Sequence, residues 1–143
     1  MRTLMTDVDL VKVADRLEEW RRWPGDDRDS VDQLQRKVNG AAVVGSDDIP
    51  ADVVTLNSRV RVTDLADAGD ATYTLVAGTQ GSTPSAISVM SPMGVALLGS
   101  RQGDEIGLWL ESGPKRLRIE DVLYQPEAAA RPAGREGIRE RRR

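Results

Sequence analysis

The spacing of the apolar residues changes once along this 143-residue chain, and the change restricts the folds open to it. Between residues 6 and 38 the apolar residues recur at helical spacing in two stripes: Leu10, Val13, Ala14, Leu17 and Trp20, then Val31, Leu34 and Val38. Pro24–Gly25 lies between the stripes, and helices avoid both residue types. Because each stripe needs an apolar partner, we predict an antiparallel helical hairpin, a short coiled coil.

Capping residues predict where the two helices begin and end. Thr6, followed three residues later by Asp9, marks the start of a first helix of about 16 residues, roughly 24 Å long at the usual rise. Ser30 and Gln33 form a capping box at the start of the second helix, and Asn39–Gly40 is a standard end.

From Ala41 onward the apolar residues alternate and β-branched residues become frequent, which is typical of strands. We predict a short edge strand at 41–44 and five further strands at 53–65, 72–78, 86–90, 105–112 and 117–125. The turn at 67–71 predicts an antiparallel pair of the strands on either side of it. The chain is therefore predicted to be an α+β protein, with a helical hairpin followed by an antiparallel sheet and one short helix.

The short helix is predicted at residues 92–98. Ser91 is the expected N-cap, Pro92 stands in the first turn where proline is tolerated, and Gly99 ends the helix. Asp104 and Glu105 then resemble a catalytic pair, but Gly103–Asp104 is a common turn and neighbouring strand residues point to opposite faces. We expect those two acids to turn the chain and start a strand.

The composition limits the chemistry available to the protein. Cysteine and histidine are both absent, which removes disulfides, Ser-His and Cys-His mechanisms, and most transition-metal sites. We expect no cofactor, no metal ion and no enzyme activity. No apolar run approaches the length of a membrane span and no signal peptide is visible, so we expect a cytoplasmic protein without membrane contacts.

Charge and composition divide the chain into three predicted regions: a helical hairpin at 1–45, a sheet domain at 46–130, and a basic tail at 131–143. The net charge is −3, but the tail carries six Arg and two Glu, so the rest of the chain is acidic. From residue 126 onward Ile138 is the only sizeable aliphatic residue, so we predict disorder there.

Three segments, preceded by the hairpin, resemble a known bacterial family. They are DDIPADVVTLNSRVRV at 47–62, ISVMSPMGVALLGSRQGDEI at 87–106 and LRIEDVLYQPEAA at 117–129. Together they resemble the Gre-factor superfamily, and VTLNSRV and LYQPEAA are most similar to its Rnk branch, the regulators of nucleoside diphosphate kinase. The resemblance covers most of residues 6–129, and the ordered combination of segments makes it specific.

The resemblance implies a coiled coil joined to an FKBP-like domain that docks at the rim of the RNA polymerase secondary channel. Nucleic acid would then be contacted only through the transcription complex. The implied contacts with polymerase lie at the Ser-Pro corner, in Met90, Ser91, Pro92 and Met93, with the hairpin tip at Trp23, Asp26 and Asp27. Family members that stimulate transcript cleavage place tip acids on a magnesium ion in the polymerase active site, whereas Rnk-type members have a shorter coiled coil and are not expected to do so.

The leading hypothesis is a non-enzymatic transcription regulator that competes with other factors for polymerase. The alternative is a cleavage-stimulating factor that uses Asp26 and Asp27, although Gly-Asp-Asp is also ordinary loop sequence. A prolyl isomerase is suggested by fold alone, and this chain lacks Phe for an aromatic pocket. A nucleic-acid module based on the basic tail is the remaining hypothesis.

Overall fold

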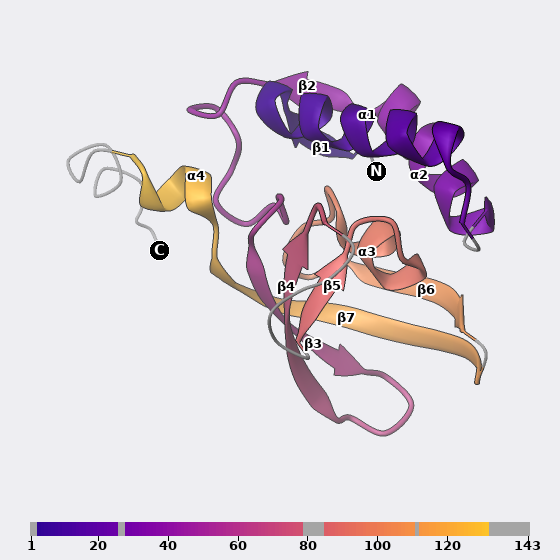
Figure 1. The fold of residues 1–143 in the computed structure, drawn as a ribbon. Helices are drawn as coiled ribbons and strands as arrows, with labels where there is room; N and C mark the ends of the chain where they lie inside the picture. The colour runs from indigo at the N-terminus through magenta and orange to yellow at the C-terminus, as the bar shows by residue number, and fades with distance from the viewer. Residues whose placement is uncertain (1–2, 26–27, 79–84, 111, 132–143) are drawn as a thin grey trace.

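The structure is a computed structural model that describes residues 3–25, 28–78, 85–110 and 112–131 (Figure 1). The elements follow one another in this order: β1 (Leu4–Thr6), α1 (Asp7–Arg22), α2 (Arg28–Gly40), β2 (Ala42–Val44), β3 (Arg59–Asp64), β4 (Asp70–Val76), β5 (Ala86–Ser88), α3 (Pro92–Leu97), β6 (Glu105–Leu110), β7 (Gly113–Tyr124) and α4 (Pro126–Ala129). The mixed α+β class predicted from the sequence is confirmed.

Helices α1 and α2 occupy the region of helical apolar spacing. The Asp9 amide donates to Thr6 Oγ1 at 3.0 Å, so Thr6 is the N-cap of α1 as predicted. The predicted start of α2 is wrong by three residues, because the helix begins at Arg28 rather than at Val31 after an N-cap at Ser30. The Arg28 guanidinium lies 5.6 Å from the centre of the Trp20 ring, a cation–π contact between the first turn of α2 and α1.

Five strands form the main sheet in the order β5-β4-β3-β7-β6. β3 pairs antiparallel with β4 and β7, and β6 pairs antiparallel with β7. The prediction of a purely antiparallel sheet is wrong at one edge, where β5 runs parallel to β4.

The predicted strand at 53–65 is wrong in its first half. Residues 53–58 form an irregular segment with a turn at 56–57. Val53 makes an isolated antiparallel bridge with Arg101, the Ser58 amide donates to the Thr55 carbonyl at 3.0 Å, and Asn57 has φ +69°. Val53, Val54 and Leu56 are nevertheless fully buried. The apolar spacing here therefore reports burial of an irregular segment rather than an extended strand.

The ends of the described chain hold two elements that the sequence did not predict. One is β1, which pairs in parallel with β2, the edge strand predicted at 41–44. This pair is separate from the main sheet. The prediction of disorder from residue 126 is wrong for α4, because Gln125 caps this helix by accepting from the Ala128 amide at 3.1 Å. Residues 132–143 of the predicted basic tail lie outside the described residues.

The hydrophobic core continues across the predicted boundary between residues 45 and 46. One cluster of buried residues joins Val13, Leu17 and Leu34 of the helices to Val60 and Ile119 of the sheet. Figure 1 shows α1, α2 and the β1–β2 pair above the five-stranded sheet, with α3 between α2 and the strands. Within the described part of the chain, no helix is long and apolar enough to cross a membrane.

Candidate protein-binding groove

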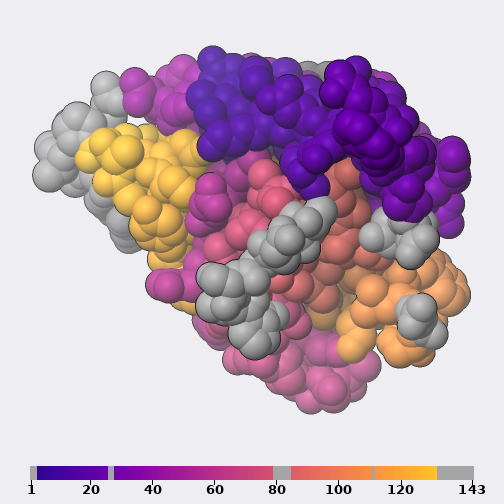
Figure 2. All heavy atoms as spheres, in the orientation of Figure 1, coloured from indigo at the N-terminus to yellow at the C-terminus, as the bar shows by residue number. Residues whose placement is uncertain are grey.

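A groove with a volume of about 640 Å³ lies where α2, α3 and β6 meet. Its lining residues come from all three elements: Arg28, Asp29, Ser30, Asp32, Gln33 and Arg36 of α2, Pro92 and Ala96 of α3, and Gly107, Leu108 and Trp109 of β6. Figure 2 shows the indigo and purple atoms of the two long helices above the orange atoms of the sheet. One wall is charged, whereas Pro92, Ala96, Leu108 and Trp109 make the other side largely apolar.

The Ser-Pro corner at the start of α3 is held rigidly. The Gly94 amide donates to Ser91 Oγ at 3.1 Å, which confirms Ser91 as the N-cap, and Ser91 Oγ donates to the Ser88 carbonyl at 2.7 Å. A Cβ atom on Gly94 would lie only 1.8 Å from the Ser88 carbonyl oxygen, so α3 packs directly on the end of β5. Pro92 is thereby fixed in the groove lining.

The four residues of the predicted corner differ in how accessible their side chains are. Ser91, Pro92 and Met93 are half-buried and partly accessible, and Met93 packs against the hydrophobic core. Met90 is 7% exposed and belongs to the core. A buried side chain stabilises the corner from beneath and offers almost no surface to a partner, so Met90 does not belong to the accessible part of the corner.

Trp109 is the residue of this groove that the sequence interpretation missed. Its side chain is 76% exposed, and it stands on β6 together with the exposed residues Glu105 and Gly107. The strand places Ile106, Leu108 and Leu110 on the opposite, more buried face. That alternation was visible in EIGLWL and could have identified Trp109 as a large apolar side chain directed to solvent.

The hairpin tip contributes one described residue of the predicted set. Trp23 follows α1 and is 71% exposed. It does not line the groove. Asp26 and Asp27 lie outside the described residues. The half-buried Trp20 packs against the core, as its place in the apolar stripe predicts.

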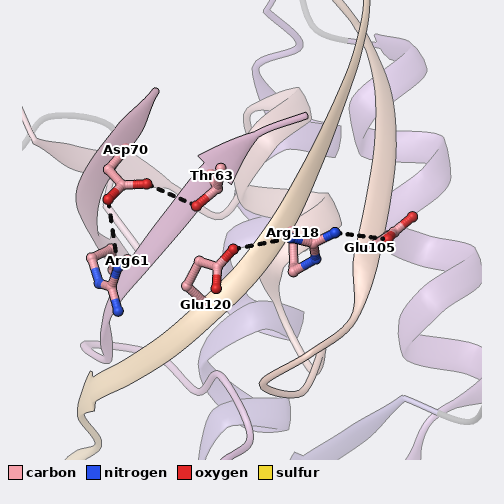
Figure 3. A network of polar contacts seen from close by, with 6 residues as sticks. All are labelled: Arg61, Thr63, Asp70, Glu105, Arg118 and Glu120. Carbon is pink, nitrogen blue, oxygen red and sulfur yellow. Dashed lines mark hydrogen bonds and ion pairs between the residues drawn. The ribbon is translucent and has the colours of Figure 1, made fainter. Parts of the chain in front are cut away.

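The outer face of the sheet carries a ladder of paired charges, shown in Figure 3. Arg118 contacts Glu105 at 3.4 Å and Glu120 at 3.3 Å, while Asp70 accepts from Thr63 at 2.8 Å and contacts Arg61 at 3.5 Å. These arginines are paired with carboxylates, which weakens this face as a phosphate-binding surface. Glu105 therefore has structural partners, as expected.

Asp104 also has a structural role. Its carboxylate accepts from the Arg101 amide at 2.9 Å and closes the turn before β6. Among the described residues, no group of three or more acids could hold a metal ion.

A buried cluster of polar groups, separate from the groove, joins α1 to α4. Asp9 is 3% exposed, and its Oδ2 accepts from the Leu56 amide at 3.0 Å. Burial raises the pKa of Asp9 to about 6, and the nearby Glu127 carboxylate adds to the shift, while the bond from Leu56 opposes it. Glu127 itself accepts from Thr55 Oγ1 at 2.7 Å, so α1, α4 and the 53–58 segment meet here.

Comparison with known proteins identifies the fold and the family. The family model "Transcription elongation factor, GreA/GreB, C-term" matches residues 49–124. A regulator of nucleoside diphosphate kinase from Escherichia coli K12 is 39% identical over 100 residues, which cover 68% of this chain and 74% of the relative. A transcription elongation factor GreA from Sulfurovum is 36% identical over 94 residues, 65% of this chain and 58% of that protein.

A solved structure gives the same result at the level of the fold. The structure described as a prokaryotic transcription elongation factor GreA/GreB from Nitrosomonas europaea aligns with a TM-score of 0.71 and 32% sequence identity, covering 86% of this chain and all of that one. The matched family region contains β3 to β7, α3 and thus the Ser-Pro corner and Trp109. This chain therefore belongs to the GreA/GreB family of transcription elongation factors.

Proposed function

We propose that this protein is a non-enzymatic transcription regulator that binds RNA polymerase at the secondary channel and competes there with other Gre-type factors. The surface proposed to dock is the groove together with the Ser-Pro corner, namely Ser91, Pro92, Met93 and Trp109. The observation that carries this proposal is the exposed Trp109 side chain, because Trp109 and Pro92 both line the groove within the region that matches the family.

The chemistry of the groove supports binding to a protein. A tryptophan that is 76% exposed is unusual on a free surface, and aromatic side chains are enriched in the centres of protein interfaces. The apolar residues of α3 and β6 face a rim of alternating charges on α2, among them Arg28, Asp32 and Arg36. An apolar centre with a charged rim is the usual composition of a specific interface.

In this proposal the helix pair is the short coiled coil of the family, and the sheet with α3 is the FKBP-like domain. Docking through the groove would direct the helix pair and Trp23 toward the channel. α1 has 16 residues, roughly 24 Å at the usual rise per residue, a short reach that favours occupancy of the channel over chemistry at the polymerase active site. The cleavage alternative depends on Asp26 and Asp27.

The proposal is tested by measuring the affinity of core RNA polymerase for groove variants. Trp109→Ala removes the exposed anchor, and Gly107→Leu adds a bulky side chain to the exposed face of β6 at a groove-lining position where an added Cβ has nothing within 4 Å. Each variant is expected to weaken binding by at least about tenfold, because loss of a central aromatic anchor typically costs more than 1 kcal/mol.

Thr72→Leu is the matched control. It adds the same leucine to an exposed position of β4, which lies three places from β6 in the sheet order. We expect it to bind as the wild type does. Wild-type affinity in both groove variants would reject the groove as the docking surface, and absence of polymerase binding by the wild-type protein would reject the proposed function itself.

A further inference from the structure

Lys37 in the last turn of α2 makes an unusual set of contacts with the end of α3. Its Nζ donates to the carbonyl oxygens of Val95 at 2.5 Å, Ala96 at 3.3 Å and Leu98 at 2.8 Å. An ammonium group has three N–H donors, so this set uses all of them. The acceptors stand at the C-terminal end of a short helix, where backbone carbonyls lack partners within the helix and where positive charge is favoured.

These contacts lie at the junction of two groove walls. Arg36, the neighbour of Lys37, belongs to the α2 wall, and Ala96, one of its acceptors, belongs to the α3 wall with Pro92. Lys37 therefore bonds the helix that carries the charged rim to the helix that carries the Ser-Pro corner. The three acceptors are 58 to 61 residues away in the sequence, so the contact is entirely tertiary.

The backbone of α3 holds the Lys37 charge without a carboxylate in contact. Among the described residues, no ion pair includes Lys37. Burial lowers the pKa of Lys37 to about 8, and the Asp104 carboxylate acts in the opposite direction. At neutral pH the group is mostly protonated, and it keeps the three donors that the carbonyls require.

We propose that Lys37 is a positioning residue that fixes α2 against α3 and so sets the shape of the groove. Its role in docking rests on the proposed function, because the groove matters to polymerase only if polymerase binds there. The contact of Lys37 with the α3 carbonyls, which we term the latch, does not itself depend on that function. Lys37→Met leaves the Val95 and Leu98 carbonyls without a donor and the Ala96 carbonyl with Ser100 Oγ alone, whereas Lys37→Arg keeps the charge and has five donors.

The latch is tested by measuring distances between pairs of spin labels, which this chain allows directly because it contains no native cysteine. Labels at Asp32→Cys on α2 and Thr72→Cys on β4 report the position of α2 over the sheet, and both positions are exposed. Labels at Glu18→Cys and Asp32→Cys report the α1–α2 pair as an internal control. Circular dichroism verifies that each variant is folded.

We expect Lys37→Met to broaden or shift the Asp32–Thr72 distance distribution, with the Glu18–Asp32 distribution unchanged, and Lys37→Arg to restore the wild-type distribution. If Lys37→Met does not fold, Lys37→Gln takes its place, since an amide can satisfy at most two of the three carbonyls. An Asp32–Thr72 distribution that is the same in a folded Lys37→Met or Lys37→Gln variant as in the wild type overturns the latch.

Polymerase affinity tests whether the latch serves docking. Lys37→Met is expected to bind core polymerase at least about tenfold more weakly, and Lys37→Arg within about twofold of the wild type. If Lys37→Met changes the Asp32–Thr72 distance distribution but leaves the affinity for core polymerase unchanged, the link between the latch and docking is overturned. If the wild type itself does not bind, the proposed function fails, and the label distances still decide whether Lys37 positions the groove.

Discussion

At the residue scale, the buried Asp9 carboxylate shows how one side chain couples distant segments of this chain. Asp9 lies in the first turn of α1 and accepts a hydrogen bond from the Leu56 amide. The Glu127 carboxylate of α4 lies nearby. The Leu56 N–H would otherwise be buried without a partner, at a cost of about 1 to 3 kcal/mol. Asp9 is therefore needed as a hydrogen-bond acceptor, although its charge is unfavourable where it lies.

The raised pKa of Asp9 predicts a specific pH dependence of stability. Between pH 3.8 and about 6 the folded chain retains a proton on Asp9 that the unfolded chain has lost, so the contribution of Asp9 to the free energy of unfolding falls as pH rises through this window. The full loss is about 3 kcal/mol as an upper value. Urea unfolding at several pH values should show this slope in the wild type relative to Asp9→Asn.

Asp9→Asn and Asp9→Ala separate charge from hydrogen bonding. Asparagine keeps an acceptor for the Leu56 amide and does not titrate, so its stability at pH 7 should equal or exceed that of the wild type. Alanine removes the acceptor and should destabilise the protein at every pH. Identical pH profiles for the wild type and Asp9→Asn would contradict the raised pKa.

At the element scale, the helices were predictable because their signal is local. The apolar stripes and the Thr6 and Ser91 caps depend on residues within a few positions of one another. Strand pairing is not local. The parallel partners β1 and β2 are separated by both long helices, and nothing within Leu4–Thr6 or Ala42–Val44 specifies the other. The strand misread at 53–58 has the same cause, because two of its bonding partners, Ser100 and Arg101, are more than 40 residues away in the sequence.

The close packing of α3 on β5 gives a prediction for a pair of glycines. Gly94→Ala should destabilise the fold by about 2 kcal/mol or more, because its Cβ would meet the Ser88 carbonyl oxygen at 1.8 Å and backbone would have to move. Gly40→Ala at the end of α2 has open space around its Cβ and should leave stability within about 1 kcal/mol, toward a gain. Chemical denaturation of both variants measures the difference, and equal stabilities would contradict the packing.

At the scale of the whole molecule, the continuous core and the Lys37 contacts hold the helix pair and the sheet in one arrangement. The Ser-Pro corner was predicted as a docking site because a resemblance pointed to it, and its role in docking stays a prediction. The groove was not, because Arg28, Pro92 and Trp109 come from three elements whose juxtaposition no single segment encodes. Met90 was predicted to contact a partner because its burial depends on neighbours distant in sequence and could not be read from its own segment.

The measurement that bears most directly on the central claim is competition for core RNA polymerase between this protein and a labelled GreA-type factor. A shared docking surface predicts that rising concentrations of the wild-type chain displace the labelled factor completely, and that Trp109→Ala displaces it only at concentrations at least about tenfold higher. Simultaneous binding of both proteins to one polymerase, with no displacement at saturation, would contradict the account.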